Sequence, residues 1–134
     1  MGLSKGDNFI IECEIEKVDG VNNNGYGIAF GIKDLENSYH FLINGNGDYL
    51  FTKSVNGKIY DIRQWSRSQY INKYNAENNI KIRKRNSVFE FFINDHLVYE
   101  TKHEDPPGTK VGFKVNKKQS VNIKNIIVKR ISSM

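Results

Sequence analysis

Residues 25–55 read GYGIAFGIKDLENSYHFLINGNGDYLFTKSV, and this stretch decides the fold class. Three runs within it alternate apolar with small or polar residues, which is the period of a half-buried β-strand. One of the short segments between the runs, Asn44-Gly45-Asn46-Gly47, is a strong hairpin signal because Asn and Gly tolerate positive φ. The stretch therefore predicts a three-stranded antiparallel meander whose inner face consists of Ile28, Phe30, Ile32, Tyr39, Phe41, Ile43, Tyr49 and Phe51.

Strand patterns continue on both sides of this meander. We expect further strands at residues 8–18, 57–65, 78–85, 88–93, 96–101, 110–115 and 119–131. Residues 66–77 form the longest polar connection and have room for a single helical turn. About ten short strands, spaced by roughly 8 to 13 residues, predict an all-β chain folded as an antiparallel sandwich or barrel. The pattern contains no linker, so we expect residues 1–134 to form a single domain, of a kind that can also be excised from a larger protein.

The charge balance is mildly basic, with 20 Lys and Arg against 15 Asp and Glu, for a net charge of +5. Most of the basic residues are scattered, but Lys81-Ile82-Arg83-Lys84-Arg85 is a dense run. This run is either an ordinary solvated strand or a patch that binds a polyanion through counterion release. Nucleic acid is not an expected partner.

Cys13 is the only cysteine, which excludes an internal disulfide and a metal site built on cysteines. It alternates with Phe9, Ile11 and Ile15, so we expect it to be a small buried residue. No run approaches the ~18 apolar residues needed to cross a membrane, and we expect no membrane insertion. Residues 1–6 lack the apolar run of a signal peptide, so the sequence itself leaves the compartment unknown.

Several short motifs resemble those of the concanavalin A-like (laminin-G-like) jelly rolls, and in particular the lectin-like, carbohydrate-associated modules of bacterial multidomain proteins. The resemblance covers Phe9 to Lys129 and is carried by Asn79-Ile80-Lys81-Ile82, by Phe92-Ile93-Asn94-Asp95-His96-Leu97-Val98, by Gly108 with Val111-Gly112-Phe113, and by Asn125-Ile126-Ile127-Val128. It implies a two-sheet antiparallel β-sandwich and favours an extracytoplasmic or cell-surface location.

Two departures from that family pattern stand out. Asp95 occupies the place of a turn glycine, which is tolerable because Asp also adopts positive φ. The chain is also short, as if one or two leading strands that close the sandwich edge were absent. We therefore expect an exposed edge near the N-terminus that would favour dimer formation by strand pairing.

The resemblance points to the face of the meander opposite its core as a ligand site. Gly27, Ala29 and Gly31 would leave one row of that face nearly bare of side chains. The next strand would add Asp61 and Arg63, or Tyr60 and Gln64, depending on its register. Sugar sites combine an aromatic platform with a few planar polar groups, and the predicted ligand-binding residues are His40, Asn44, Asp61, Arg63, Trp65 and Tyr70. The alternative for Trp65 is that it caps the core.

Catalysis is not expected from these residues. Glu12, Glu14 and Glu16 share one strand face, but they only superficially resemble the paired acids of related glucanases, because the central Asp of that pattern is missing. Retaining hydrolysis needs two carboxyl groups about 5 Å apart across a cleft. The histidines His96 and His103 are expected at the surface.

The resemblance also allows a structural calcium ion, although no cofactor is required. Candidate ligands are Asp19 with residues 22–24, or Asp34 with Glu36, and neither group has the charge density of a calcium loop. The expected function is a non-catalytic carbohydrate-binding module with a shallow concave face, whose partner is a glycan or glycoconjugate. The alternative is a protein-interaction or structural laminin-G-like module that contacts another protein or a domain of the same parent chain.

Overall fold

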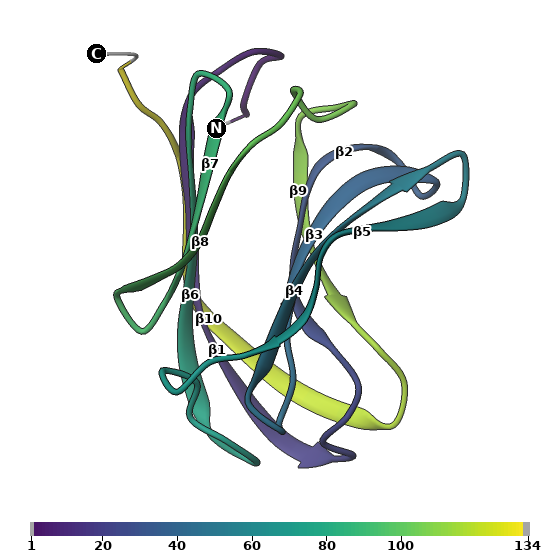
Figure 1. The fold of residues 1–134 in the computed structure, drawn as a ribbon, viewed down its shortest axis with the longest axis vertical. Helices are drawn as coiled ribbons and strands as arrows, with labels where there is room; N and C mark the ends of the chain where they lie inside the picture. Colours follow the sequence, from purple (N-terminus) through teal and green to yellow (C-terminus); the bar gives the residue numbers. More distant parts are fainter. Residues whose placement is uncertain (1, 133–134) are drawn as a thin grey trace.

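The computed structural model describes residues 2–132, which form two five-stranded antiparallel sheets packed face to face (Figure 1). Sheet A has the strand order β10-β1-β6-β7-β8 and sheet B the order β5-β4-β3-β2-β9. The strands are β1 (Phe9–Gly20), β2 (Tyr26–Asp34), β3 (Asn37–Ile43), β4 (Asp48–Val55), β5 (Lys58–Arg67), β6 (Glu77–Arg85), β7 (Val88–Ile93), β8 (His96–Lys102), β9 (Lys110–Val115) and β10 (Gln119–Arg130).

This architecture confirms the predicted two-sheet β-sandwich of about ten strands. The helical turn expected within residues 66–77 is wrong, because β5 extends to Arg67 and only turns and bends follow it. The described residues contain no helix, and hence no helix that could span a membrane. The tight turn between β7 and β8 uses two non-glycine residues at positive φ, Asn94 (49°) and Asp95 (68°), which explains how Asp95 serves in place of glycine.

Aromatic side chains from the two sheets meet in the core. Phe51 of sheet B lies 4.6 Å from Phe91 of sheet A, and Phe30 lies 6.3 Å from Phe89, both measured between ring centroids. All four side chains are fully buried, and each contributes about 2–3 kcal/mol through the hydrophobic effect. Cys13 is buried as predicted, and burial raises the pKa of its thiol to about 12.

The prediction that Ile32 fills the core is wrong, because β2 contains a bulge at Gly31. Gly31 has φ +57°, and the register between β2 and β9 shifts between Ala29 and Ile32. A Cβ atom at Gly31 would lie 2.0 Å from Pro106 Cβ, so only glycine fits there. Beyond the bulge the alternation is inverted, and Ile32 lies on the outer face of sheet B, 3.5 Å from the place of a Cβ at Gly112.

The expected exposed edge near the N-terminus is also absent from the described residues, because β1 lies between β10 and β6. The edge strands of sheet A are β10 and β8, and those of sheet B are β5 and β9. Register shifts interrupt the pairing of β10, β8 and β5, and on β10 the interruption coincides with Asn125 at φ 55°. Bulged edges resist pairing with another strand, whereas the edge strand β9 has no bulge of its own, and the edge-to-edge dimer stays a prediction.

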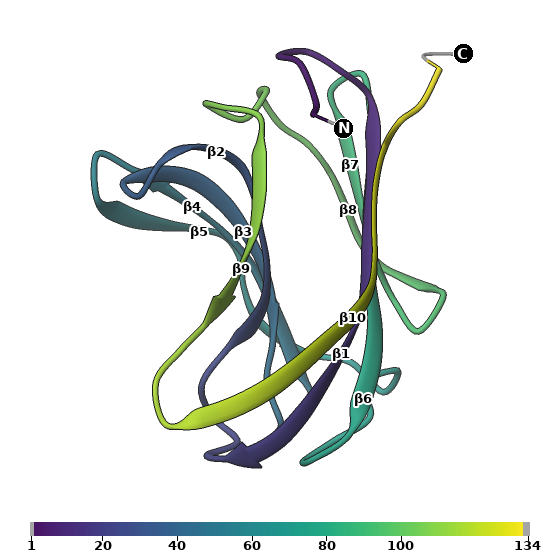
Figure 2. The same cartoon turned by 180° about the vertical axis from the view of Figure 1, so that it is seen from behind.

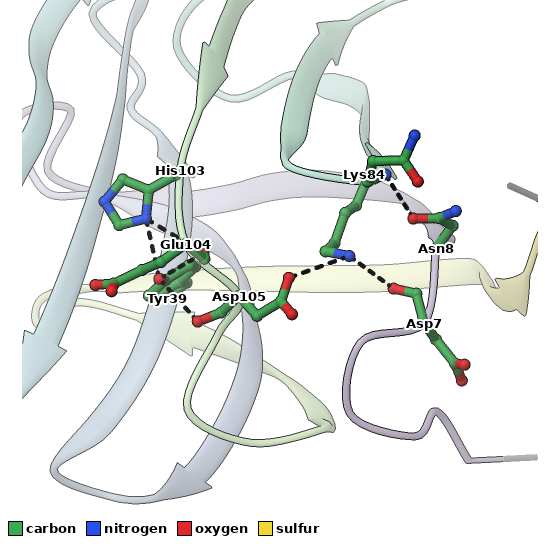
Figure 3. A network of polar contacts seen from close by, with 8 residues as sticks. Asp7, Asn8, Tyr39, Lys84, His103, Glu104 and Asp105 are labelled. Carbon is green, nitrogen blue, oxygen red and sulfur yellow. Dashed lines mark hydrogen bonds and ion pairs between the residues drawn. The ribbon is translucent and has the colours of Figure 1, made fainter.

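A polar network closes one end of the sandwich (Figure 3). The crossover between β8 and β9 brings Asp105 to within 3.3 Å of the buried Lys84 ammonium, which also donates to the Asp7 carbonyl at 3.1 Å. Nearby, the Tyr39 hydroxyl lies 3.0 Å from His103 Nδ1, so His103 is tied down rather than free at the surface. A buried charge is costly unless it is paired, so these contacts fix the crossover against both sheets.

Candidate functional site

The outer face of sheet B is hollowed. In Figures 1 and 2 the β2–β3 and β4–β5 hairpins lean away from sheet A, so their outward side is concave. A hollow of about 370 Å³ lies there, and among the side chains that line it are Ala29, Ser38, His40, Ser54, Ile59 and Lys114. This is the face on which the sequence predicts His40.

The strand register arranges the outer face in rows across the sheet. One row runs from β9 to β5 through Gly112, Ala29, His40, Thr52 and Asp61. It therefore places a histidine, a hydroxyl and a carboxylate side by side at spacings of about 5 Å, the distance between neighbouring strands.

His40 is the centre of that row and is held on both sides of its ring. Its Nε2 atom lies 2.9 Å from Ser38 Oγ and its Nδ1 atom 3.2 Å from Thr52 Oγ1. The side chain is only 6% exposed although it points away from the core. Burial, and next the charge of Lys114, lower the pKa of His40 to about 4. The ring is therefore neutral at pH 7, with one nitrogen donating and the other accepting a hydrogen bond.

The adjacent row is apolar and ends in the only tryptophan. It runs through Leu42 of β3 and Leu50 of β4, which pair with each other and are 3% and 8% exposed. A bulge in β5 places Gln64 and Trp65 opposite the single residue Leu50. Trp65 Cη2 lies 3.1 Å from the place of a Cβ at Gly25, so the indole lies over the outer face and reaches the start of β2.

Trp65 consequently does not cap the core. Its side chain stays 41% exposed, which is a large exposed fraction for an aromatic side chain that is held in place by neighbours. An exposed, ordered indole beside polar groups is the usual form of an aromatic platform in binding sites.

A second bulge separates two of the predicted residues. Asp61 pairs with Thr52 and Phe51 pairs with Arg63, which leaves Ile62 as an extra residue on β5. The sequence allowed two registers for β5, with either Asp61 and Arg63 or Tyr60 and Gln64 on the outer face. The structure matches neither register fully, because Asp61 lies on the outer face while Arg63 lies on the core side with Phe51.

Arg63 and Tyr70 belong to another part of the surface, where the edges of β5 and β8 face each other. The Arg63 guanidinium lies 5.2 Å from the ring centroid of Tyr99 and 6.0 Å from that of Tyr49. Tyr70 stacks on His96 with a centroid separation of 3.8 Å and an angle of 9°. These two predicted residues therefore lie apart from His40 and Trp65.

Asn44 holds the turn next to the outer face. Its Oδ1 atom accepts hydrogen bonds from the amides of Asn46 and Asp48, both at 3.0 Å, and the residue is 4% exposed. Of the six predicted residues, the structure thus brings together His40, Asp61 and Trp65, places Asn44 beside them, and separates Arg63 and Tyr70.

The glycines expected to leave a bare row have other roles. A Cβ at Gly27 would lie 2.3 Å from the Phe41 carbonyl oxygen, so Gly27 allows two strands to approach closely. Gly31 faces Pro106 at the bulge. Gly27 still lies on the outer face, because it pairs with Leu42 and Lys114, so the small residues that remain there include Gly27, Ala29 and Gly112.

Lys114 is a charged lining residue that was not predicted from the sequence, and Ser38, Ser54 and Ile59 were not predicted either. The alternation of Val111, Phe113 and Val115 does point Lys114 to the opposite face of its strand. The residue that pairs with Lys114 on the adjacent strand could not be predicted, because the pairing of β9 with β2 joins segments more than eighty positions apart, as in the pair of Gly27 with Lys114.

The candidate metal ligands have local partners. Asp34 Oδ1 accepts from the Glu36 amide at 2.9 Å and from Asn37 Nδ2 at 3.0 Å, and the contact with Asn37 comes first among the causes that lower its pKa. Asp19 Oδ1 accepts from the Gly20 amide at 2.8 Å. Within residues 2–132 no three His, Cys, Asp or Glu side chains gather as metal ligands would.

The basic run also has local partners. Arg83 forms a two-pronged ion pair with Glu90, at 2.7 and 3.2 Å, and Lys81 lies 4.6 Å from the centroid of Phe92. Lys84 points inward and is buried. Of the three acids on β1, Glu14 lies near Lys124 at 3.9 Å. The run is therefore a strand with one side in the core and the other side largely paired.

No family model matches this sequence, and no curated protein matches it. Solved structures do match its fold. Carbohydrate-binding module CBM66 from Bacillus subtilis has a TM-score of 0.77 at 19% identity, covering 94% of this chain and 77% of the module. Sheep galectin-11, in complex with glycerol, has a TM-score of 0.71 at 9% identity, covering 96% of this chain and 95% of the galectin.

A third structure comes from a much longer chain. The GH43 protein BlXynB from Bacillus licheniformis has a TM-score of 0.68 at 12% identity, and the match covers 91% of this chain but 27% of that one. These matches show that the chain has the concanavalin A-like lectin/glucanase-type β-sandwich fold, shared with bacterial carbohydrate-binding modules and galectins. At such identities the likeness concerns the fold, and function depends on the site itself.

Proposed function

We propose that this chain is a non-catalytic carbohydrate-binding module whose ligand lies on the concave outer face of sheet B. The observation that supports it most is the position of Trp65, which is exposed and ordered over that face instead of packing into the core. The resemblance of the fold to CBM66 and to galectins is consistent with this proposal.

The mechanism follows from the two rows. The C–H face of a sugar ring would pack against the exposed indole of Trp65, which desolvates both surfaces without a directional bond. Ring hydroxyls would exchange hydrogen bonds with Asp61 and with the hydroxyls of Ser38 and Thr52, which His40 orients because both of its ring nitrogens contact them. Because the hollow is open and shallow, we expect dissociation constants of roughly 10 µM to 1 mM.

The arrangement of acids supports a binding role over hydrolysis. Asp61 lies on β5 at the end of the His40 row, and Asp34 lies at the β2–β3 turn with its carboxylate engaged by local donors. A retaining glycosidase needs two carboxyl groups about 5 Å apart at one bond.

The test is a glycan array with the isolated chain, followed by titration of the best ligand with the Trp65→Ala variant. We expect Trp65→Ala to weaken binding at least about 30-fold, the loss of roughly 2 kcal/mol of aromatic contact. The matched control is Tyr74→Ala, because Tyr74 is 60% exposed but lies in the loop after β5.

Unchanged binding by Trp65→Ala, or no binding to any glycan of the array, would refute the proposal. If Trp65→Ala fails to fold, Asp61→Ala provides the same test at an exposed position. In that case binding as tight as that of the original chain would count against the proposal.

A second candidate is a protein-interaction module, favoured by apolar side chains at the hairpin tips. Leu35 is completely exposed at the β2–β3 turn, and Ile59 and Tyr60 of β5 are 51% and 43% exposed. Tyr60→Ser, at a position that does not line the hollow, should weaken binding to a protein partner and leave glycan binding intact, so the two candidates separate in one pair of measurements.

A further inference from the structure

Within the part of the chain that the structure describes, Lys114 is the cation that lines the hollow of the concave face, and no carboxylate neutralises it. Lys114 pairs with Gly27 across β9 and β2, points to the outer face and lines the hollow beside His40. Among residues 2–132, ion pairs join carboxylates to Lys53, Arg67, Arg83, Lys84 and Lys124, and none involves Lys114.

The carboxylates of this face lie away from Lys114, and Lys110, the other outward lysine of β9, pairs with Ile32 beyond the bulge. Asp61 is on β5, four strand spacings from β9, or about 19 Å. Asp34 is at the hairpin end of the hollow, and one of its oxygens is already held by the Glu36 amide and Asn37. His40 is neutral near pH 7, so Lys114 sets the local potential at its end of the hollow.

Lys114 is also close to the tip of the aromatic platform. The indole of Trp65 reaches Gly25, while Lys114 pairs with Gly27, two residues further along β2. Two residues of strand and one strand spacing separate these points by roughly 8 Å, which is comparable to one sugar residue. Gly27 has no side chain to stand between them.

We propose that the sugar bound on this face carries a carboxylate, with its ring against Trp65 and its carboxylate paired with Lys114. This inference rests on the proposed function and names the class of ligand: a glycan that contains uronic acid residues. A charge-assisted hydrogen bond from a half-buried lysine orients the ring as well as holding it.

Isothermal titration with oligosaccharides of galacturonic, glucuronic and mannuronic acid, each beside its methyl ester, tests this inference. The ester keeps the sugar skeleton and removes the charge. We expect one acid to bind about three- to tenfold more tightly than its ester, the range of a partly exposed ion pair.

Two lysine variants test whether Lys114 causes the preference for the acid over its methyl ester. Lys114→Met should bind the acid only as well as the ester, whereas Lys110→Met on the same strand should behave like the original chain. Higher salt should weaken binding of the acid and not of the ester. Trp65→Ala should lose both ligands.

Equal binding of acid and ester, or a Lys114→Met variant that keeps the preference, would overturn this inference. If binding in that case still depends on Trp65, the proposed function stands and only the ligand class is wrong. If neither acid nor ester binds, while neutral glycans of the array do, the inference is again wrong and the proposed function stands. If nothing on the array binds, both are wrong.

Discussion

The outer faces of the two sheets obey the same alternation and yet differ in what they present. Sheet A exposes charged residues that pair across strands, as Arg83 does with Glu90. Sheet B presents Leu42, Leu50 and His40, which are buried although they point away from the core. On sheet B, the curvature of the sheet and the indole of Trp65 bury side chains that point away from the core. A buried outer face of this kind requires a structural or functional explanation, whereas the charged, solvated outer face of sheet A does not.

The largest expected effect concerns His40 and pH. Its pKa is about 4 in the folded chain and 6.5 in the unfolded chain, so the unfolded state binds more protons between these values. Stability is therefore lost as the pH falls from about 6.5 to about 4, by about 3 kcal/mol for this residue. Urea unfolding at a series of pH values should show this loss in the original chain and not in His40→Gln.

His96→Gln is the control for that comparison, because His96 is an exposed histidine of sheet A. Its pH profile should follow that of the original chain, since the carboxylates that titrate in the same range are unchanged. Parallel profiles for the original chain and His40→Gln would show that His40 is not held neutral by its surroundings.

The next effect compares apolar and charged residues at outward positions. Leu42→Ala removes a side chain that is 3% exposed, and we expect a loss of about 2 kcal/mol in unfolding free energy. Glu16→Ala, at an outward exposed position of sheet A, should change it by no more than about 0.5 kcal/mol. Equal losses in urea denaturation would mean that the two faces are equally solvated.

The smallest effect is the ion pair on sheet A. A double-mutant cycle with Arg83→Met and Glu90→Gln should give a coupling energy of about 1 kcal/mol, because the pair is two-pronged and partly buried. Hydrogen bonding by Arg83 lowers the pKa of Glu90, so the coupling should disappear only in strong acid. A coupling energy of zero would show that this face is held by its strands alone.

The strand pattern was predictable because alternation depends on local residues. The eight predicted core positions of the meander include seven that are fully or almost fully buried. The exception, Ile32, follows Gly31, whose bulge depends on contact with Pro106, and that contact is not visible in a local pattern. A bulge shifts the strand register by one residue, so every later side chain of that strand points to the opposite face of the sheet.

The site was predictable only in part, for the same reason. His40 lies on the predicted face because its neighbours Tyr39 and Phe41 are core residues. Arg63 was placed on the wrong side because the bulge at Ile62 inverts the register of β5. Trp65 shares the outer face with Leu42 through a second bulge, and Lys114 joins it through long-range pairing of β9 with β2.

The buried Lys84 has a consequence for the kinetics of folding. Its ammonium binds Asp7, 77 positions earlier, and the neighbouring contact of Tyr39 with His103 spans 64 positions. Contacts between such distant segments require large loops to close, and they give their stabilisation only after both sheets have formed. We therefore expect these contacts to form late in folding, so that the network slows unfolding more than it speeds folding.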